Sequence, residues 1–286
     1  MQELAADLGY LAPIKLKWIG NTFSGPQDIQ ACVTGDVDYG GAFNGSIEKL
    51  IAAGAPIKAV IGSSGSDGVA FSALYVLDAS QFHTAHDLIS RKIGVNTLGA
   101  AVEFSLDNYL QRGGLSVAEI AGVTLAVMPP SAQEQALRQG VIDGAIMSGI
   151  FRDRALDRGS LRHLYTDYEL FGPLTSGSYV LTLSFMQRYP NAARKFVEAT
   201  ARAIVWLQTH PREEVITRFA DIIKKRNRSE DPTLVTYWKS SGIGPRGGRL
   251  SDRDFAMYID WYVKNGALRP GQLKPGDVYT NQFNPY

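Results

Sequence analysis

A short stretch of this chain occurs twice, and it limits the possible folds more than any other feature. The copies are residues 30–40 (QACVTGDVDYG) and 135–145 (QALRQGVIDGA). Each reads Gln-Ala, then a glycine four positions after the alanine and an aspartate three positions later, followed by small or apolar residues. This pattern predicts a helix that ends at a glycine, then a tight turn and a buried strand. The copies are further apart than the roughly 20–50 residues of solenoid repeats, so we expect two similar α/β lobes. Chance recurrence of a common helix–glycine–strand unit is the alternative.

The remaining hydrophobic patterns alternate between strands and helices in both halves of the chain. The expected strands cover residues 14–19, 57–61, 70–77, 92–95, 124–128 and 179–183, and the expected helices cover residues 1–8, 27–34, 47–53, 102–111, 117–120, 191–208, 213–225, 232–239 and 252–265. Residues 62–68 (GSSGSDG) are expected to form a flexible loop. Alternating strands and helices favour open α/β sheets. Ligands of such sheets bind beyond the C-terminal ends of the strands.

Composition excludes several classes of function. The 29 basic and 28 acidic residues nearly balance, which does not indicate binding to nucleic acid or to an anionic membrane. No apolar run approaches the roughly 20 residues needed to span a bilayer. Cys32 is the only cysteine, so an intramolecular disulfide, a cysteine-based metal cluster and a redox pair are all excluded. We expect no cofactor.

The N-terminus lacks a feature that an α/β lobe would have. Residues 1–9 already read as a helix with a glycine stop, and neither a signal peptide nor an opening strand precedes them. We therefore expect that the chain has been shortened or that its start has been assigned too late.

The sequence contains no Gly-x-Ser-x-Gly elbow, Walker loop or His-Glu-x-x-His motif. His83 and His86 could share a face as metal ligands, but we interpret them as a surface pair. Asp38 and Asp143 recur once per copy; each stands in the turn before a strand, so we assign them to turns or caps. Arg152 could bind an anion, although a surface arginine is the simpler interpretation. We predict no catalytic residue and no metal site.

Polar residues recur in the turns that follow the expected strands. Each serine or asparagine alone reads as a helix N-cap. Together, with the N-termini of the following helices, they could line one cleft for a small polar or anionic ligand. These turns contain Asn21, Thr22, Ser24, Phe43, Asn44, Ser63, Ser64, Asn96, Thr97, Ser131, Met147 and Ser148.

Several segments, in this order, resemble the periplasmic substrate-binding proteins of ABC importers, in the group that binds nitrate, taurine, aliphatic sulfonates and thiamin pyrimidines. The segments are residues 31–40, 50–60 (LIAAGAPIKAV), 87–95 (DLISRKIGV), 136–145 and 189–192 (YPNA). The resemblance covers essentially the whole chain and implies a two-lobe, hinge-linked type II binding fold. Lobe 1 would comprise residues 1–80 and 180–286, and lobe 2 residues 83–176.

The resemblance also implies a function and a set of ligand contacts. The function would be that of a periplasmic or lipid-anchored extracellular receptor, a monomer that binds a small molecule between its lobes, without catalysis, and delivers it to a membrane permease. Two departures leave the ligand open: the first strand is absent, and residues 144–147 (GAIM) offer no aromatic residue at the position where the family often has one. The implied ligand contacts are Asn21, Thr22, Phe43, Asn44, Ser63, Asn96, Thr97, Gly99, Ala100 and Ser148.

Two other functions stay open. An enzyme on the same fold, such as a pyrimidine-precursor synthase or a menaquinone-pathway lyase, is one; a single cysteine argues against the cysteine-rich synthases. A ligand-sensing domain of a larger regulator is the other, although no DNA-binding segment is evident. For the ligand itself, the residues favour an anionic or aromatic organic molecule. Phe23, Phe43 and Phe71 are candidate ring contacts, and core positions are the equal alternative for them.

Overall fold

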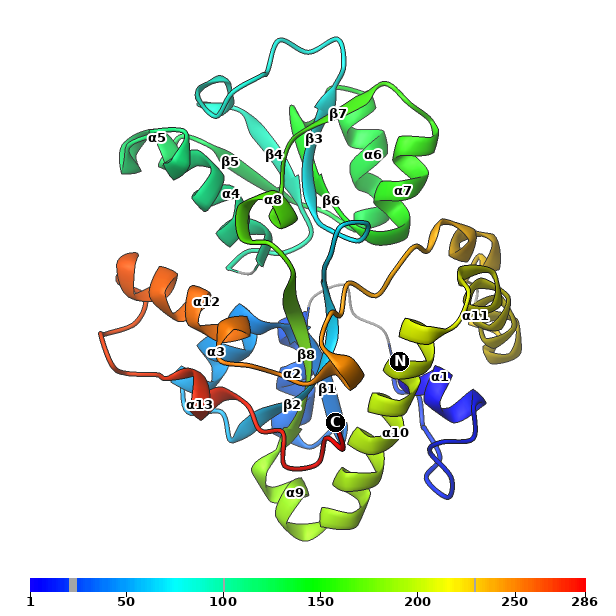
Figure 1. The fold of residues 1–286 in the computed structure, drawn as a ribbon. Coiled ribbons are helices and arrows are strands. Elements are labelled where there is room, and N and C mark those ends of the chain that lie inside the picture. Colours follow the sequence, from blue (N-terminus) through cyan, green and yellow to red (C-terminus); the bar gives the residue numbers. More distant parts are fainter. Residues whose placement is uncertain (21–24, 100, 229) are drawn as a thin grey trace. The chain divides into compact units, whose positions relative to one another are not determined.

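A computed structural model describes residues 1–20, 25–99, 101–228 and 230–286 (Figure 1). The chain divides into two compact units. Unit 1 contains residues 1–65, 174–236 and 240–286, and unit 2 contains residues 66–173 and 237–239. These boundaries lie earlier than the predicted ones at residues 80 and 176. Strand β3 (Ala73–Leu77) belongs to unit 2 because it pairs with strands of that unit on both sides.

Unit 1 is built on a three-stranded sheet of order β1-β8-β2. Its strands are β1 (Tyr39–Phe43), β8 (Leu174–Thr182) and β2 (Ile57–Ser66). Its helices are α1 (Gln2–Asp7), α2 (Gly25–Thr34), α3 (Asn44–Ala52), α9 (Leu183–Arg188), α10 (Pro190–Thr209), α11 (Arg212–Arg226), α12 (Arg253–Lys264) and α13 (Pro275–Val278), with 3-10 turns η2 (Pro232–Tyr237) and η3 (Arg246–Gly248).

The long helix α10 supplies much of the core of unit 1. Phe196, Val197 and Ile204 lie on its buried face and pack against Ile61 of β2 and Leu181 of β8. A fully buried aliphatic side chain stabilises a fold by about 1.5–3 kcal/mol, so this stripe fixes α10 on the sheet. The helices predicted at residues 191–208, 213–225 and 252–265 are confirmed as α10, α11 and α12.

Unit 2 contains a five-stranded sheet of order β5-β4-β6-β3-β7, with helices on both faces. Its strands are β5 (Thr124–Val127), β4 (Lys92–Val95), β6 (Gly144–Met147), β3 and β7 (Leu161–Thr166). Its helices are α4 (Ala101–Arg112), α5 (Val117–Ala121), α6 (Pro130–Arg138), α7 (Gly149–Asp157) and α8 (Asp167–Phe171), with the 3-10 turn η1 (His86–Leu88).

Alternate residues of the unit 2 strands face opposite layers, as the period of two in a strand requires. Leu74 and Ile146 join the core beneath α4, whereas Tyr75 and Met147 join the core beneath α6 and α7. Strands buried on both faces must be apolar at nearly every position. This explains why β6 reads as the continuous apolar run GAIM.

Both copies of the repeated stretch form the predicted structure. Gly35 follows α2 with φ +86° and precedes β1, and Gly140 lies at the end of α6 with φ +70° and precedes β6. A positive φ is open to glycine at little cost, which is why a glycine ends each helix.

Three local predictions are wrong. Residues 14–19, which the structure describes, form no strand; Trp18 and Ile19 are exposed, and Arg228 stacks over the Trp18 ring. Residues 62–66 continue β2 instead of forming a loop, because Gly62 permits close packing: a Cβ there would lie 2.9 Å from Thr175 Cγ2. The helix predicted at residues 232–239 is a 3-10 turn that ends at Tyr237. Strand β7 was not predicted.

Candidate functional site

The register of the unit 2 sheet brings five chain segments to one edge. Val95 of β4 lies opposite Val127 of β5, and Ala73 of β3 lies opposite both Met147 of β6 and Thr166 of β7. Strands β4, β5 and β6 are parallel, and β7 runs in the same direction because both it and β6 are antiparallel to β3. The turns after β4, β5, β6 and β7 therefore meet at the edge where α/β sheets bind ligands.

Four predicted ligand contacts lie in these turns. Asn96 and Thr97 follow β4, and the Asn96 Oδ1 atom is buried with no hydrogen-bond partner in the described part of the chain. The N–H of Gly99 donates to Glu103 Oε2 at 2.5 Å, so a carboxylate already occupies the start of α4. Ser148 follows β6 and is exposed. Ala100 lies outside the described residues.

Unit 1 gathers other predicted contacts around Gly177 of β8. Phe43, the last residue of β1, lies opposite Gly177. A Cβ on Gly177 would lie 2.6 Å from Ser64 Oγ and 3.1 Å from Ser63 Oγ, so both serines of β2 border the same glycine. Asn21 and Thr22 lie outside the described residues.

Asn44 has a structural role that its position in a polar turn did not reveal. Its side chain is 0% exposed. Both of its amide hydrogens are used, because Nδ2 donates to the carbonyl oxygens of Thr175 at 2.8 Å and Asp254 at 3.0 Å, while Oδ1 accepts from Ser178 Oγ at 2.7 Å. The amide thus ties the start of α3 to β8 and α12. Ligand contact by Asn44 stays a prediction, and this side chain has no donor left for it.

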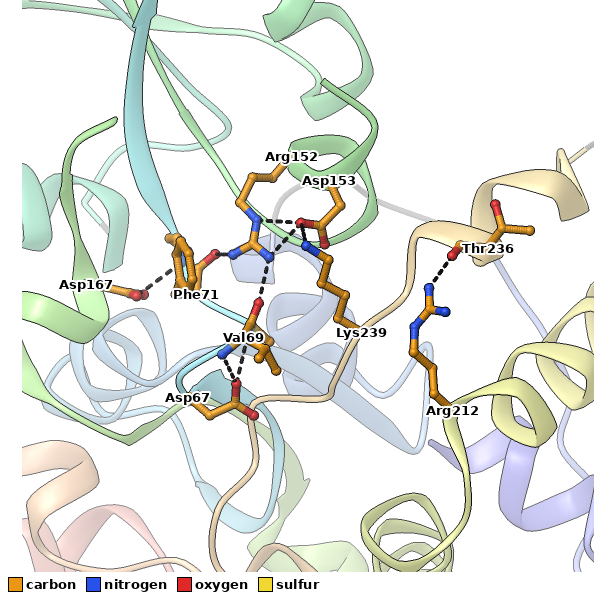
Figure 2. Close-up of polar contacts among 11 residues, drawn as sticks. Asp67, Val69, Phe71, Arg152, Asp153, Asp167, Arg212, Thr236 and Lys239 are labelled. Atoms are coloured by element: carbon orange, nitrogen blue, oxygen red, sulfur yellow. Dashed lines mark hydrogen bonds and ion pairs between the residues drawn. The ribbon is translucent and has the colours of Figure 1, made fainter. Parts of the chain in front are cut away.

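Arg152 is not the surface residue that the sequence suggested. It lies on α7, is 1% exposed, and its guanidinium stacks 4.1 Å from the centroid of the Phe71 ring. It donates to the carbonyl oxygens of Phe71 at 2.7 Å and Val69 at 2.8 Å, and to Asp153 Oδ1 from both Nε and Nη2 (Figure 2). Lys239 also approaches Asp153, at 3.0 Å. The arginine can be buried because each of its three side-chain nitrogens donates to an acceptor.

Asp167 is a further polar group of this edge that the sequence analysis missed. It follows β7 and accepts from Ser66 Oγ at 2.7 Å and from the N–H of Ser72 at 3.1 Å. Burial raises the pKa of Asp167 to about 6 in spite of these hydrogen bonds. Recognition of β7 would have revealed it, but the mixed sequence LRHLYT hid that strand.

The residues assigned to surfaces and turns lie as expected. His83 and His86 are exposed, and the described residues contain no cluster of three or more His, Cys, Asp or Glu that could hold a metal ion. Asp143 Oδ2 accepts from the N–H of Lys92 at 2.8 Å, at the start of β4, away from the candidate site. In the same described residues, no helix is both long enough and apolar enough to cross a bilayer.

Comparisons with known proteins support a common fold. The sequence model of the NMT1-like family matches residues 21–224. A search of curated proteins found no match. Among solved structures, the chain is similar to the periplasmic aliphatic sulphonate-binding protein SsuA from Escherichia coli, with a TM-score of 0.73 and 18% identity over 97% of this chain and 87% of that chain.

Two other solved structures share this likeness. The periplasmic nitrate-binding protein NrtA from Synechocystis PCC 6803 has a TM-score of 0.73 and 13% identity, over 98% of this chain and 83% of that chain. The desulfurization enzyme DszB has a TM-score of 0.65 and 16% identity, over 99% of this chain and 93% of that chain. These matches confirm the predicted resemblance and the α/β fold class of periplasmic binding proteins.

Proposed function

Because the chain belongs to the NMT1-like family, we propose that it is a solute-binding receptor of an ABC importer, which binds a small organic or anionic molecule without catalysis. The observation that carries this proposal is the gathering of polar turns at one edge of the unit 2 sheet, where Asn96 Oδ1 is buried and has no hydrogen-bond partner among the described residues. A buried acceptor of this kind is normally satisfied by a ligand or by water. The names of SsuA and NrtA, sulphonate-binding and nitrate-binding, agree with such a role.

The groups at this edge favour a ligand that has both an acceptor and a donor. Ser148 is the N-cap of α7, makes no side-chain cap, and is exposed. The free N–H groups of this helix start attract an anionic or polar acceptor group. Asn96 Oδ1, in contrast, needs a donor. An organic acid or sulfonate that also carries an N–H or O–H group would satisfy both, whereas nitrate would satisfy only the helix.

The remaining features of the proposal follow from the receptor role. The proposed ligand contacts are Asn96, Thr97, Gly99, Ala100 and Ser148 in unit 2, and Asn21, Thr22, Phe43 and Ser63 in unit 1. The buried amide of Asn44 instead holds α3 against β8 and α12. The receptor works as a monomer in the periplasm, or on an outer surface by a lipid anchor, and delivers its ligand to a membrane permease. It has no nucleic-acid partner, cofactor or metal.

A thermal-shift panel tests this proposal on the purified protein. Compounds that carry both a donor and an anionic group, such as amino-sulfonates and aromatic acids with a ring hydroxyl, are expected to raise the melting temperature more than nitrate does. Ser148→Ala should weaken binding of the best compound by about tenfold or more, since a hydrogen bond to a charged group contributes about 1.5–3 kcal/mol. Ser116→Ala, which removes the N-cap serine of α5, is the matched control and should leave binding unchanged. Equal effects of the two variants would contradict the assignment of Ser148.

An enzyme on the same fold is the second candidate, because DszB is a desulfurization enzyme. Cys32 is a poor nucleophile for such a reaction. It is 1% exposed, and burial raises the pKa of its thiol to about 11. At neutral pH it is therefore a thiol and not the reactive thiolate. Turnover of a panel compound by the purified protein would favour the enzyme over the receptor.

A further inference from the structure

Gln133 is a buried polar residue of unit 2 that neither the sequence analysis nor the proposed function uses. It is the fourth residue of α6 and is 1% exposed. Its Nε2 atom is buried and has no hydrogen-bond partner among the described residues. A buried donor that makes no hydrogen bond is costly to keep, so such a group is normally satisfied by water or by a ligand.

The direction of α6 places Gln133 at the edge of the unit 2 sheet where ligands are expected. The helix begins at Pro130, three residues after the end of β5, so its N-terminal end lies at the C-terminal ends of the parallel strands. Leu137, one turn after Gln133, is 1% exposed and packs with Ala145 and Met147 of β6. Residues four apart share one face of a helix. Gln133 therefore faces the sheet, nearer than Leu137 to the turns after β4 and β6.

Asn96 lies on the same side of this sheet. Helix α6 packs on both β4 and β6. A Cβ on Gly94 of β4 would lie 2.6 Å from Ile142 Cδ1 and 3.5 Å from Met128 Sδ, two side chains of the core beneath α6 and α7. The N–H of Met128 donates to the carbonyl oxygen of Val95 at 2.9 Å, so β4 and β5 stay paired up to the turn. Alternate residues of a strand share a face. The side chain two positions after Gly94, that of Asn96, therefore lies on the α6 side.

The buried atoms of Asn96 and Gln133 are chemically complementary. Asn96 Oδ1 is an acceptor and Gln133 Nε2 is a donor, yet no hydrogen bond joins the two side chains. The neighbouring carboxylate of Glu134 does not take the place of an acceptor, because its oxygens accept from Arg138 at 3.0 Å and from Arg158 at 3.1 Å. One acceptor and one donor are thus left for a third group at the same end of the same layer.

We propose that Asn96 and Gln133 together bind one group of the ligand that both donates and accepts a hydrogen bond, such as a hydroxyl or a carboxamide. The inference rests on the proposed receptor function and narrows its ligand. A hydroxyl has one donor and two acceptor lone pairs, so it satisfies both side chains. An ammonium group has three donors and no acceptor, so it leaves Gln133 without a partner. Gln133 therefore selects a hydroxy acid or amide acid over the matching amino acid or amino-sulfonate.

Calorimetric titration of matched compounds tests this selectivity on the full chain. One pair is hydroxyethanesulfonate and aminoethanesulfonate, and the other is hydroxymethylbenzoate and aminomethylbenzoate. Each pair keeps its anionic group and exchanges only a hydroxyl for an ammonium. The parent protein should bind the hydroxyl member of a pair about tenfold more tightly, a ratio that corresponds to about 1.4 kcal/mol.

Variants of Gln133 show whether this residue causes the preference. Gln133→Glu exchanges the donor for a carboxylate of the same size and should reverse the preference, because an ammonium pairs with the new charge. Gln133→Met removes the donor and should abolish the preference. Gln135→Glu adds the same charge at an exposed position of the same helix and should keep the preference of the parent.

Thermal unfolding without ligand separates ligand selection from a purely structural role. Because Nε2 of Gln133 makes no hydrogen bond within the described protein, Gln133→Met should melt at a temperature no lower than that of the parent. A lower melting temperature together with an unchanged preference would overturn the inference, since Gln133 would then serve only the fold. Equal binding of both members of each pair by the parent, or an unchanged preference in Gln133→Glu, would overturn it and leave the receptor function standing. Failure of the parent to bind any of the four compounds or any other organic anion would contradict both.

Discussion

The two copies of the repeated stretch share their local structure but treat a buried carboxyl group in opposite ways. An acidic residue stands ten positions after the aspartate of each copy. Glu48 in α3 follows Asp38, and Asp153 in α7 follows Asp143. Both residues are buried: Glu48 is 0% exposed and Asp153 is 6% exposed. Asp153 is paired with Arg152 and Lys239. Neither Glu48 oxygen has a hydrogen-bond partner in the described chain, and burial raises the pKa of Glu48 well above its usual value.

This difference shows what a local repeat can and cannot specify. The glycine and the strand follow from the repeated residues themselves. The charge state of the carboxyl that comes later depends on what packs against it. Unit 2 places the guanidinium of Arg152 and the ammonium of Lys239 beside Asp153. No charged group contributes to the shift at Glu48, so desolvation alone favours its neutral form.

Replacing Asp153 should have the largest effect on this comparison. Asp153→Ala leaves the buried Arg152 without its carboxylate, and such a loss destabilises a fold by about 3–5 kcal/mol. The free energy of unfolding, from urea denaturation monitored by hydrogen exchange of β6, measures this change. Asp221→Ala removes an exposed partner of Lys224 and should cost at most about 1 kcal/mol. If Asp153→Ala destabilised the protein as little as Asp221→Ala, the pairing of Asp153 with Arg152 would not stabilise unit 2.

Replacing Glu48 should change the pH dependence of stability. The pKa is higher in the folded state, so between the unfolded value near 4.5 and the folded value the folded protein holds a proton that the unfolded chain has lost. Stability must therefore fall as pH rises through this window, by about 1.4 kcal/mol per pH unit. Glu48→Gln cannot ionise, so its advantage over the parent should grow as pH rises above 4.5.

Unfolding free energies measured from pH 4 to pH 8 decide this point. Glu198→Gln, at a partly exposed position of α10, is the control and should keep the pH dependence of the parent. If Glu48→Gln also kept that dependence, Glu48 would be ionised in the folded protein, and the contrast with Asp153 would disappear.

The smallest effect is expected at the glycines, where the two copies should behave alike. Gly35→Ala and Gly140→Ala add a Cβ that meets no atom within 4 Å, so only the positive φ is penalised. Each substitution should cost about 1–2 kcal/mol of unfolding free energy. A marked difference between the two costs would mean that the repeated stretches do not share the local structure assigned to them.

The sequence predicted those parts of the fold that local chemistry specifies. Helix–glycine–strand units and the amphipathic α10 have strong periodic patterns, and they were found within a few residues of their true ends. Residues 14–19 alternate lysine with apolar residues as an edge strand would, yet no strand pairs with them in the described sheet of unit 1. Strand formation there depends on a distant partner, which a local pattern cannot reveal.

The turns of the candidate site were predicted from the sequence, whereas its buried polar groups were missed. The turns after β4 and β6 are visible because polar residues follow apolar strands. Arg152 looks like one of several charges in a surface helix, and nothing local shows that the carbonyl groups of residues 69 and 71 reach it. Asn44 likewise reads as a polar turn residue, whereas its three partners lie more than a hundred residues away in the chain.

Native mass spectrometry of the purified protein, before and after gentle denaturation, tests the proposed receptor function most directly. A receptor is expected to carry a small molecule that is released on denaturation, whose mass identifies a compound with both a donor and an acceptor group. If the protein is empty, addition of the best compound from the thermal-shift panel should produce a one-to-one complex. An empty protein that forms no complex with any panel compound would contradict the receptor function.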